Sequence, residues 1–140
     1  MLIQIDSREK NNLHIVRYFA SKGVDCICSK MYVGDYCKYS KPLLVVERKA
    51  SWLEFAGNCG KNHARFKAEL ERLSAVGGRM VILIEETIPV EIWQHRRSQM
   101  SGAVMKKIID RWKEEYKLEL VQCTKNESGK KILEILGEQK

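Results

Sequence analysis

The sequence predicts an α/β fold in which a central mixed sheet carries helices on both faces. Short apolar segments typical of strands alternate along the chain with amphipathic segments of helical period, which is the pattern of layered α/β domains. No repeat, low-complexity tract or interdomain linker interrupts this alternation. Strands are expected over 2–6, 25–33, 42–48, 80–85 and 118–123, and helices over 12–22, 61–76, 101–116 and 128–136.

Local signals support these elements in chain order. The first expected helix has asparagine at its start and Gly23 after its end, and both are typical of helix caps. The apolar run over 43–46 predicts a buried strand. Residues 86–100 have no regular period, so we expect a long loop or a short helix there. Apolar residues at three- and four-residue spacing predict that the helix over 101–116 buries one face in the core or in a dimer: Val104, Met105, Ile108, Ile109, Trp112 and Tyr116.

The composition indicates one globular domain covering 1–140, with 44% apolar and 31% charged residues. No apolar run approaches the roughly 20 residues of a membrane span. The first six residues have the pattern of a strand rather than a leader, so we expect an intracellular protein, in the cytoplasm, nucleoid or nucleus. The five cysteines have no C-x-x-C spacing, which disfavours a zinc site, and we expect Cys26 and Cys28 to be buried free thiols.

The net charge of +7 is unevenly distributed. Residues 58–79 contain five Lys or Arg against two acids, and residues 91–107 contain four against one. Basic residues concentrated in two segments favour a polyanionic partner such as DNA, because each phosphate that is neutralised releases counterions.

Charged residues of both signs lie at the ends of neighbouring expected strands. Glu47 and Lys49 follow the apolar run, and because side chains alternate along a strand they point the same way while Arg48 points opposite. Asp35 lies on the expected preceding hairpin strand. Two carboxylates can hold Mg²⁺, and a neighbouring lysine can position the attacking water or neutralise charge on a phosphate. This combination predicts hydrolysis of a phosphodiester.

The charged residues belong to a longer pattern. Residues 34–35 and 47–49 together resemble the GD…ERK motif of the XPF-type branch of the PD-(D/E)xK nucleases. Residues 5–9 resemble the D-x-R-E segment that opens this family, residues 64–69 its G-R-[FL]-x-x-Q helix, and residues 80–85 its next strand. The resemblance implies a restriction-endonuclease-like core that uses Mg²⁺ or Mn²⁺ to cut branched DNA such as a flap, fork or junction, in DNA repair or recombination.

The resemblance also implies roles for individual residues. Asp35, Glu47 and the backbone carbonyl of Arg48 would bind the metal ion, and Lys49 would act in catalysis. Asp6, at the end of the first strand, where α/β sheets often bind ligands, is either a further catalytic metal ligand or a cap of the following turn. Basic residues expected to bind DNA, or else to form a solvated charged face, are Arg8, Arg65, Lys67, Arg72, Arg96 and Arg97.

The sequence departs from the family pattern in several places. Leu53, with Glu54 beside it, stands where an Asp is usual, and Glu69 and Ala64 replace the Gln and Gly of the helix motif. We expect no tandem helix-hairpin-helix domain, which many relatives use to hold DNA, after the nuclease core. Two alternatives to a branch-specific nuclease are therefore a non-catalytic DNA-binding or scaffold subunit of a nuclease pair and a nuclease without branch specificity.

The resemblance implies pairing as well, because relatives dimerise through this core. We expect a homodimer or a complex with another DNA-binding chain, which would place two basic surfaces around one DNA junction. The helices over 101–116 and 128–136 are the candidates for that interface.

Overall fold

The computed structural model describes residues 1–137, so the last three residues of the expected 1–140 domain lie outside the described part. Its six strands form one sheet in the order β2-β1-β3-β4-β5-β6. The strands are β1 (Leu2–Ile5), β2 (Asp25–Cys28), β3 (Tyr36–Lys38), β4 (Lys41–Lys49), β5 (Arg79–Ile84) and β6 (Glu119–Gln122). The helices are α1 (Leu13–Ser21), α2 (Trp52–Cys59), α3 (His63–Ala75), α4 (Gly102–Tyr116) and α5 (Ser128–Gly137), with short 3₁₀ turns η1 (Val90–Ile92) and η2 (Lys125–Glu127).

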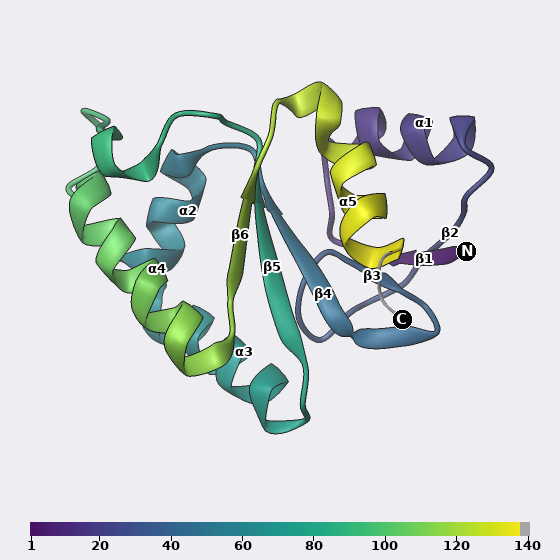
Figure 1. Cartoon of the computed structure of the whole chain (residues 1–140), viewed down its shortest axis with the longest axis horizontal. Coiled ribbons are helices and arrows are strands. Elements are labelled where there is room, and N and C mark those ends of the chain that lie inside the picture. The colour runs from purple at the N-terminus through teal and green to yellow at the C-terminus, as the bar shows by residue number, and fades with distance from the viewer. Residues whose placement is uncertain (138–140) are drawn as a thin grey trace.

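The sheet is mixed, as expected. β1 pairs in parallel with β2 and antiparallel with β3, β3 and β4 form an antiparallel hairpin, and β4, β5 and β6 are parallel. Figure 1 shows the sheet between two helical layers, with α2, α3 and α4 on one face and α1 and α5 on the other. The predicted fold class is therefore confirmed. Because β4 and β5 are parallel, their carboxyl ends meet at one edge, where α/β folds commonly bind ligands.

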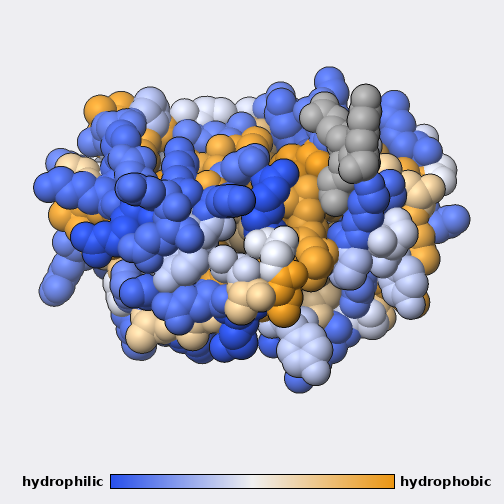
Figure 2. Space-filling model, turned by 60° about the horizontal axis from the view of Figure 1, so that its bottom comes forward, coloured by the Kyte–Doolittle hydropathy of each residue, from blue (hydrophilic) through white to orange (hydrophobic). Residues whose placement is uncertain are grey.

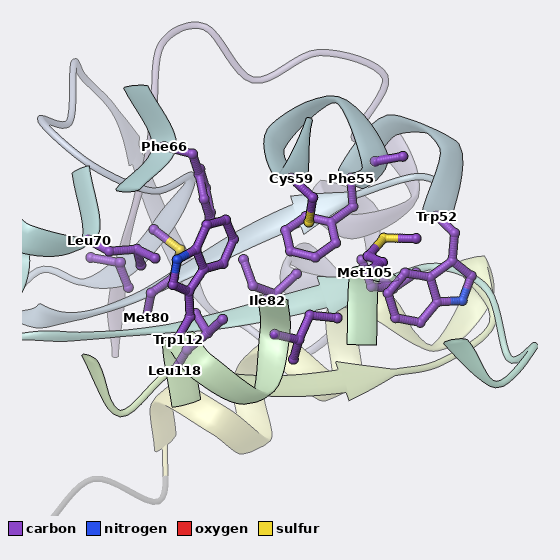
Figure 3. Packing of buried hydrophobic residues seen from close by; sticks show 14 of the residues in the cluster. Trp52, Phe55, Cys59, Phe66, Leu70, Met80, Ile82, Met105, Trp112 and Leu118 are labelled. Carbon is purple, nitrogen blue, oxygen red and sulfur yellow. The ribbon is translucent and has the colours of Figure 1, made fainter. Parts of the chain in front are cut away.

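Each face of the sheet has its own apolar core, because side chains alternate along every strand. On β4, Leu44 and Val46 face α1 and α5, whereas Val45 faces α2, α3 and α4. Figure 3 shows the core on the side of α2, α3 and α4, where the rings of Phe66 and Trp112 lie 5.3 Å apart between α3 and α4. This packing holds α3 against α4 on one face of the sheet.

The strand expected over 25–33 is shorter than predicted, because β2 ends at Cys28 and an irregular loop leads to β3. The loop leaves the sheet because Met31 bonds to side chains instead of a neighbouring strand: its N–H donates to Asp6 and its carbonyl accepts from Arg8. The expectation of buried Cys26 and Cys28 was wrong as well. Both thiols are exposed, since β2 is an edge strand.

Among the α-helices of residues 1–137, only α2 is not predicted by hydrophobic periodicity, since its eight residues give too few repeats. Its start has a recognisable signal, the S-x-x-E pattern of Ser51 and Glu54. The Ser51 hydroxyl accepts a hydrogen bond from the Glu54 N–H at 3.1 Å. This helix turns the chain sharply after β4 and brings Glu54 back beside the end of that strand.

The apolar stripe of α4 serves the core, since Met105, Ile109 and Trp112 are buried against the sheet. Of its other members, Val104 is 46% exposed. Helix α5 likewise buries its apolar side chains against the opposite face of the sheet. None of the helices within residues 1–137 has the length and apolar character needed to cross a bilayer.

Candidate active site

A cavity of about 310 Å³ opens at the carboxyl end of β4. Five of the residues predicted from the sequence line it, although they come from three separate parts of the chain: Arg8, Asp35, Glu47, Arg48 and Lys49. Glu9 and Glu54 complete its acidic side chains. The fold thus gathers the charged motif into one polar site.

Gly34 allows Asp35 to lie against β4. Its φ of +83° is unfavourable for residues with a side chain, and a Cβ atom there would lie 2.7 Å from the Cβ of Val45. The tight approach lets the Asp35 N–H donate to the carbonyl of Val46 at 2.8 Å. One carboxylate oxygen of Asp35 accepts from the N–H of Arg48, also at 2.8 Å. The carboxylate is therefore held beside the motif strand.

Glu47 and Lys49 lie side by side, as strand alternation predicted. The Lys49 ammonium nitrogen is 3.3 Å from one carboxylate oxygen of Glu47, and both side chains are largely buried. Arg48 points to the opposite face of the sheet, where it contacts Glu9 and Glu85. The site therefore presents two acids and one ammonium group on the same side of the sheet.

The electrostatics of the two acids favour a bound cation. Burial, followed by the charges of Glu47 and Glu9, raises the pKa of Asp35 to about 8. Burial also raises the pKa of Glu47, although Lys49 opposes this effect. A divalent cation between the two carboxylates would relieve their repulsion and their desolvation.

The donor set fits Mg²⁺ or Mn²⁺ rather than a cation held by protein ligands alone. Within residues 1–137, no group of three or more His, Cys, Asp or Glu side chains is placed to hold a metal ion. Mg²⁺ commonly binds through one or two carboxylates and keeps several waters that substrate oxygens can replace. Asp35 and Glu47, which line the cavity, are the two carboxylates that could meet that requirement.

Behind the motif strand lies a buried ionic network that was not predicted. The Arg48 guanidinium donates two hydrogen bonds to Glu9, each at 2.9 Å, and one to Glu85 at 2.7 Å. Glu85 also bonds to His14 at 2.7 Å and accepts from the hydroxyl of Ser128. The side chain of Glu9 is buried in this network. The network ties β4 to the first loop, to the end of β5 and to both helices on this face.

Asp6 is buried but does not line the cavity. One carboxylate oxygen accepts from Arg8 at 2.9 Å and the other from the N–H of Met31 at 2.8 Å. Although burial alone would raise the pKa of Asp6, these hydrogen bonds lower it. In this arrangement the Asp6 carboxylate positions Arg8 and the loop at Met31, and the Asp6 N–H donates to the main-chain carbonyl of Asp35 at 2.8 Å.

The basic residues predicted to bind DNA fall into separate groups. Arg8 borders the cavity and is 64% exposed. Arg65 is exposed on α3, one turn before Glu69, whose charge acts on both Arg8 and Glu47. Arg72 lines a different groove, and Arg96 and Arg97 border hollows formed by the loop before α4. Lys67 is half-buried on α3 and is not among the residues that line the cavity.

Comparison with known proteins identifies the family. A family model described as the ERCC4 domain matches residues 5–135. The chain belongs to the ERCC4 domain family. This result confirms the predicted resemblance to an XPF-type nuclease core.

Solved structures share the fold of this ERCC4 domain. The chain is similar to XPF from Aeropyrum pernix, with a TM-score of 0.75 and 21% identity, over 97% of this chain and 63% of that one. It is similar to the same protein in a complex with DNA, with a TM-score of 0.74 and 20% identity over the same shares. The chain therefore spans less than two thirds of the XPF chain. No curated protein sequence matches this ERCC4 domain.

The departure from the family pattern at Leu53 has a structural counterpart in this ERCC4 domain. Leu53 packs against the apolar core on the first turn of α2. Glu54, the next residue, lines the cavity, and its carboxylate lies 3.9 Å from the Lys49 ammonium. An acid is thus present beside the lysine, one position later in the sequence. The S-x-x-E helix start at Ser51 was the signal that could have located it.

Proposed function

We propose that this chain is a metal-dependent DNA endonuclease that hydrolyses phosphodiester bonds. The observation that carries the proposal is the pair of buried carboxylates, Asp35 and Glu47, held beside Lys49 in one cavity of a basic ERCC4 domain. Their raised pKa values and the small number of protein ligands favour a cation that substrate oxygens can reach.

In this proposal Asp35, Glu47 and the main-chain carbonyl of Arg48 would hold one or two Mg²⁺ or Mn²⁺ ions. Such an ion, when bound, lowers the pKa of a coordinated water and polarises a phosphoryl oxygen. Lys49 orients the attacking water or stabilises the negative charge that develops on the phosphate. Arg8, exposed at the rim and held by Asp6, binds a phosphate oxygen of the DNA backbone.

We further propose that the substrate is branched DNA, such as a flap, fork or junction, in DNA repair or recombination. The family resemblance and the basic excess support DNA as the partner, and the similar XPF from Aeropyrum pernix was solved in a complex with DNA. Pairing with a second copy, or with another DNA-binding chain, would provide additional contact with the arms of a junction.

The test is cleavage of labelled flap, fork, four-way junction, duplex and single-stranded DNA in Mg²⁺, with EDTA as the control. We expect cutting near the branch point, much faster than cutting of duplex, and complete loss of cutting in EDTA. Equal cutting of every substrate would support a nuclease without branch specificity. Binding without cutting, in both Mg²⁺ and Mn²⁺, would contradict catalysis and favour a scaffold subunit.

Metal binding should be coupled to proton release from Asp35. Its pKa rises from 3.8 to about 8 on folding, so between these values the native state binds more protons than the unfolded state. The stability of the metal-free protein should therefore fall as the pH rises through this range. A cation must displace the proton, so Mn²⁺ affinity should rise by up to about tenfold per pH unit between pH 6 and 8.

Titration calorimetry in two buffers of different ionisation enthalpy measures both the affinity and the protons released. Asp35→Asn is the matched variant, because it keeps the side-chain volume but has no titrating proton. It should bind Mn²⁺ weakly, and thermal unfolding of the metal-free variant should show less loss of stability toward pH 8. Mn²⁺ affinity that is the same at pH 6 and pH 8 would contradict the linkage.

A further inference from the structure

A second groove lies on the same face of the sheet as Glu47 and Lys49, toward the start of β4. Its volume is about 390 Å³, which is within the usual range of roughly 300–1,000 Å³ for sites that bind small molecules. Its floor is a row of neighbouring residues on β1, β3 and β4, namely Gln4, Cys37 and Val45. Figure 2 brings the end of the molecule with the α3–β5 turn toward the viewer and shows apolar residues gathered there between hydrophilic ones.

The walls of the groove are apolar and belong to two different elements. The loop from residue 30 to 33 forms one wall, where Met31 and Val33 are buried. The carboxyl end of α3 forms the other, with Leu73 and, just past the helix, Val76, which is 61% exposed. Apolar surface on both sides of a slot suits a flat apolar ligand.

The groove also carries an exposed aromatic ring and positive charge. Tyr32 is 96% exposed, although both of its sequence neighbours are buried, so its ring adds almost nothing to the packing of the domain. Lys30, on the same loop, and Arg72, on the opposite wall, are both exposed. An aromatic ring beside apolar walls, with a cation on each side, matches a nucleotide: a base that stacks and phosphates that carry negative charge.

The position of the groove links it to the cavity with the two acids. Val45 in the groove floor and Glu47 in the cavity are alternate residues of β4, so their side chains are separated along the strand by about 7 Å. Stacked nucleotides follow one another at roughly 3.4 Å along a DNA strand. A nucleotide in the groove would therefore lie within about two positions of a phosphate at Glu47.

We propose that this groove binds an unpaired nucleobase of the strand that is cut, close to the scissile phosphate. The inference rests on the proposed nuclease function and adds a substrate site to it. Tyr32 stacks on the base, the apolar walls cover its faces, and Lys30 and Arg72 neutralise the flanking phosphates. The floor amide of Gln4 is already bonded to Ser29 and accepts from the thiol of Cys37, so the groove accepts any base.

Tyr32→Ala tests the proposal without disturbing the fold, because the ring is almost fully exposed. The probe is a short single-stranded oligonucleotide with one fluorescent 2-aminopurine, titrated with the full chain in EDTA so that no cutting occurs. Loss of the stacking partner should weaken the affinity about tenfold. Tyr32→Phe should bind as the wild type does, and so should Tyr39→Ala, which removes a half-exposed tyrosine outside the groove. Affinity for duplex DNA of the same sequence should not change.

Two results would overturn this inference and leave the proposed function standing. The first is that Tyr32→Ala binds the oligonucleotide as tightly as the wild type does, although the wild type cuts DNA in Mg²⁺. The second concerns Leu43→Asp, a change within the groove. If this variant alters the oligomeric state in light scattering and leaves the oligonucleotide affinity unchanged, the groove is a protein contact. Conversely, a wild type that binds through Tyr32 and never cuts DNA would support the groove and contradict the nuclease proposal.

Discussion

Replacement of Glu47 by alanine should lower the rate of DNA cleavage by about a thousandfold or more while leaving DNA binding nearly unchanged. Glu47 is buried, faces the cavity and lies 3.3 Å from Lys49. The substitution removes one of the two carboxylates available for the cation. The pKa of Glu47 is raised mainly by burial, so its charge opposes folding and its loss should not unfold the domain. Lys49→Ala should have a similar effect on cleavage, since the ammonium would no longer act on the phosphate.

Single-turnover cleavage of a labelled flap measures the chemical step directly, and gel shift in EDTA measures binding. Glu114→Ala is the matched control, because this acid is exposed on α4 and lies outside the cavity. Glu54→Gln tests whether the acid beside Lys49 replaces the one missing at Leu53, and it should give an intermediate rate. Cleavage near the wild-type rate in Glu47→Ala or Lys49→Ala would exclude the mechanism.

Replacement of Arg48 by methionine should destabilise the protein by about 3–5 kcal/mol. The guanidinium is 7% exposed and donates hydrogen bonds to Glu9 and Glu85, which are themselves buried. Methionine has a similar length and fills the space, so the loss of stability comes from two buried carboxylates that no longer have the guanidinium as a partner. Burial raises the pKa of Glu85, and its hydrogen bonds and the charge of Arg48 lower it. Without Arg48 the pKa of Glu85 rises, and its protonation relieves part of the lost stability, so the destabilisation should be larger at pH 8 than at pH 5.

Urea unfolding at both pH values gives the free energy of unfolding of each variant. Arg79→Met is the control, since the ion pair of Arg79 with Glu119 is exposed and contributes at most about 1 kcal/mol. Glu9→Gln and Glu85→Gln together should recover part of the stability lost in Arg48→Met, because they remove the unpaired charges. Equal losses in Arg48→Met and Arg79→Met would show that the network is not a source of stability.

Much of the fold follows from short-range patterns in the chain. The apolar run of β5 and the stripe of α4 are long enough for their periods to be unambiguous, and the structure has both elements close to the predicted ends. Alternation along β4 likewise placed Glu47 and Lys49 on one face and Arg48 on the other. These features depend only on backbone geometry, which repeats every two or 3.6 residues.

Elements too short to repeat were harder to predict. Helix α2 has eight residues, and the N-cap at Ser51 is the only local signal that indicates it. The loop after β2 contains the apolar residues Met31 and Val33, which are typical of a strand, but it leaves the sheet because Asp6 and Arg8 bond to its backbone. In such segments a few tertiary hydrogen bonds outweigh a weak local preference.

The sequence by itself determined the fold class, the family and the charged motif residues that line the cavity, Asp35, Glu47 and Lys49. Each of these depends on neighbouring residues or on motif spacing. Only the tertiary structure decided that Asp6 faces Arg8 and that Glu9 and Glu85 enclose Arg48. It also decided that Tyr32 stands beside an apolar groove. The contacts of Arg48 join residues 37 and 39 positions apart. No local pattern encodes these contacts, because the burial that makes an unpaired charge unfavourable arises only when the sheet and both helical layers assemble.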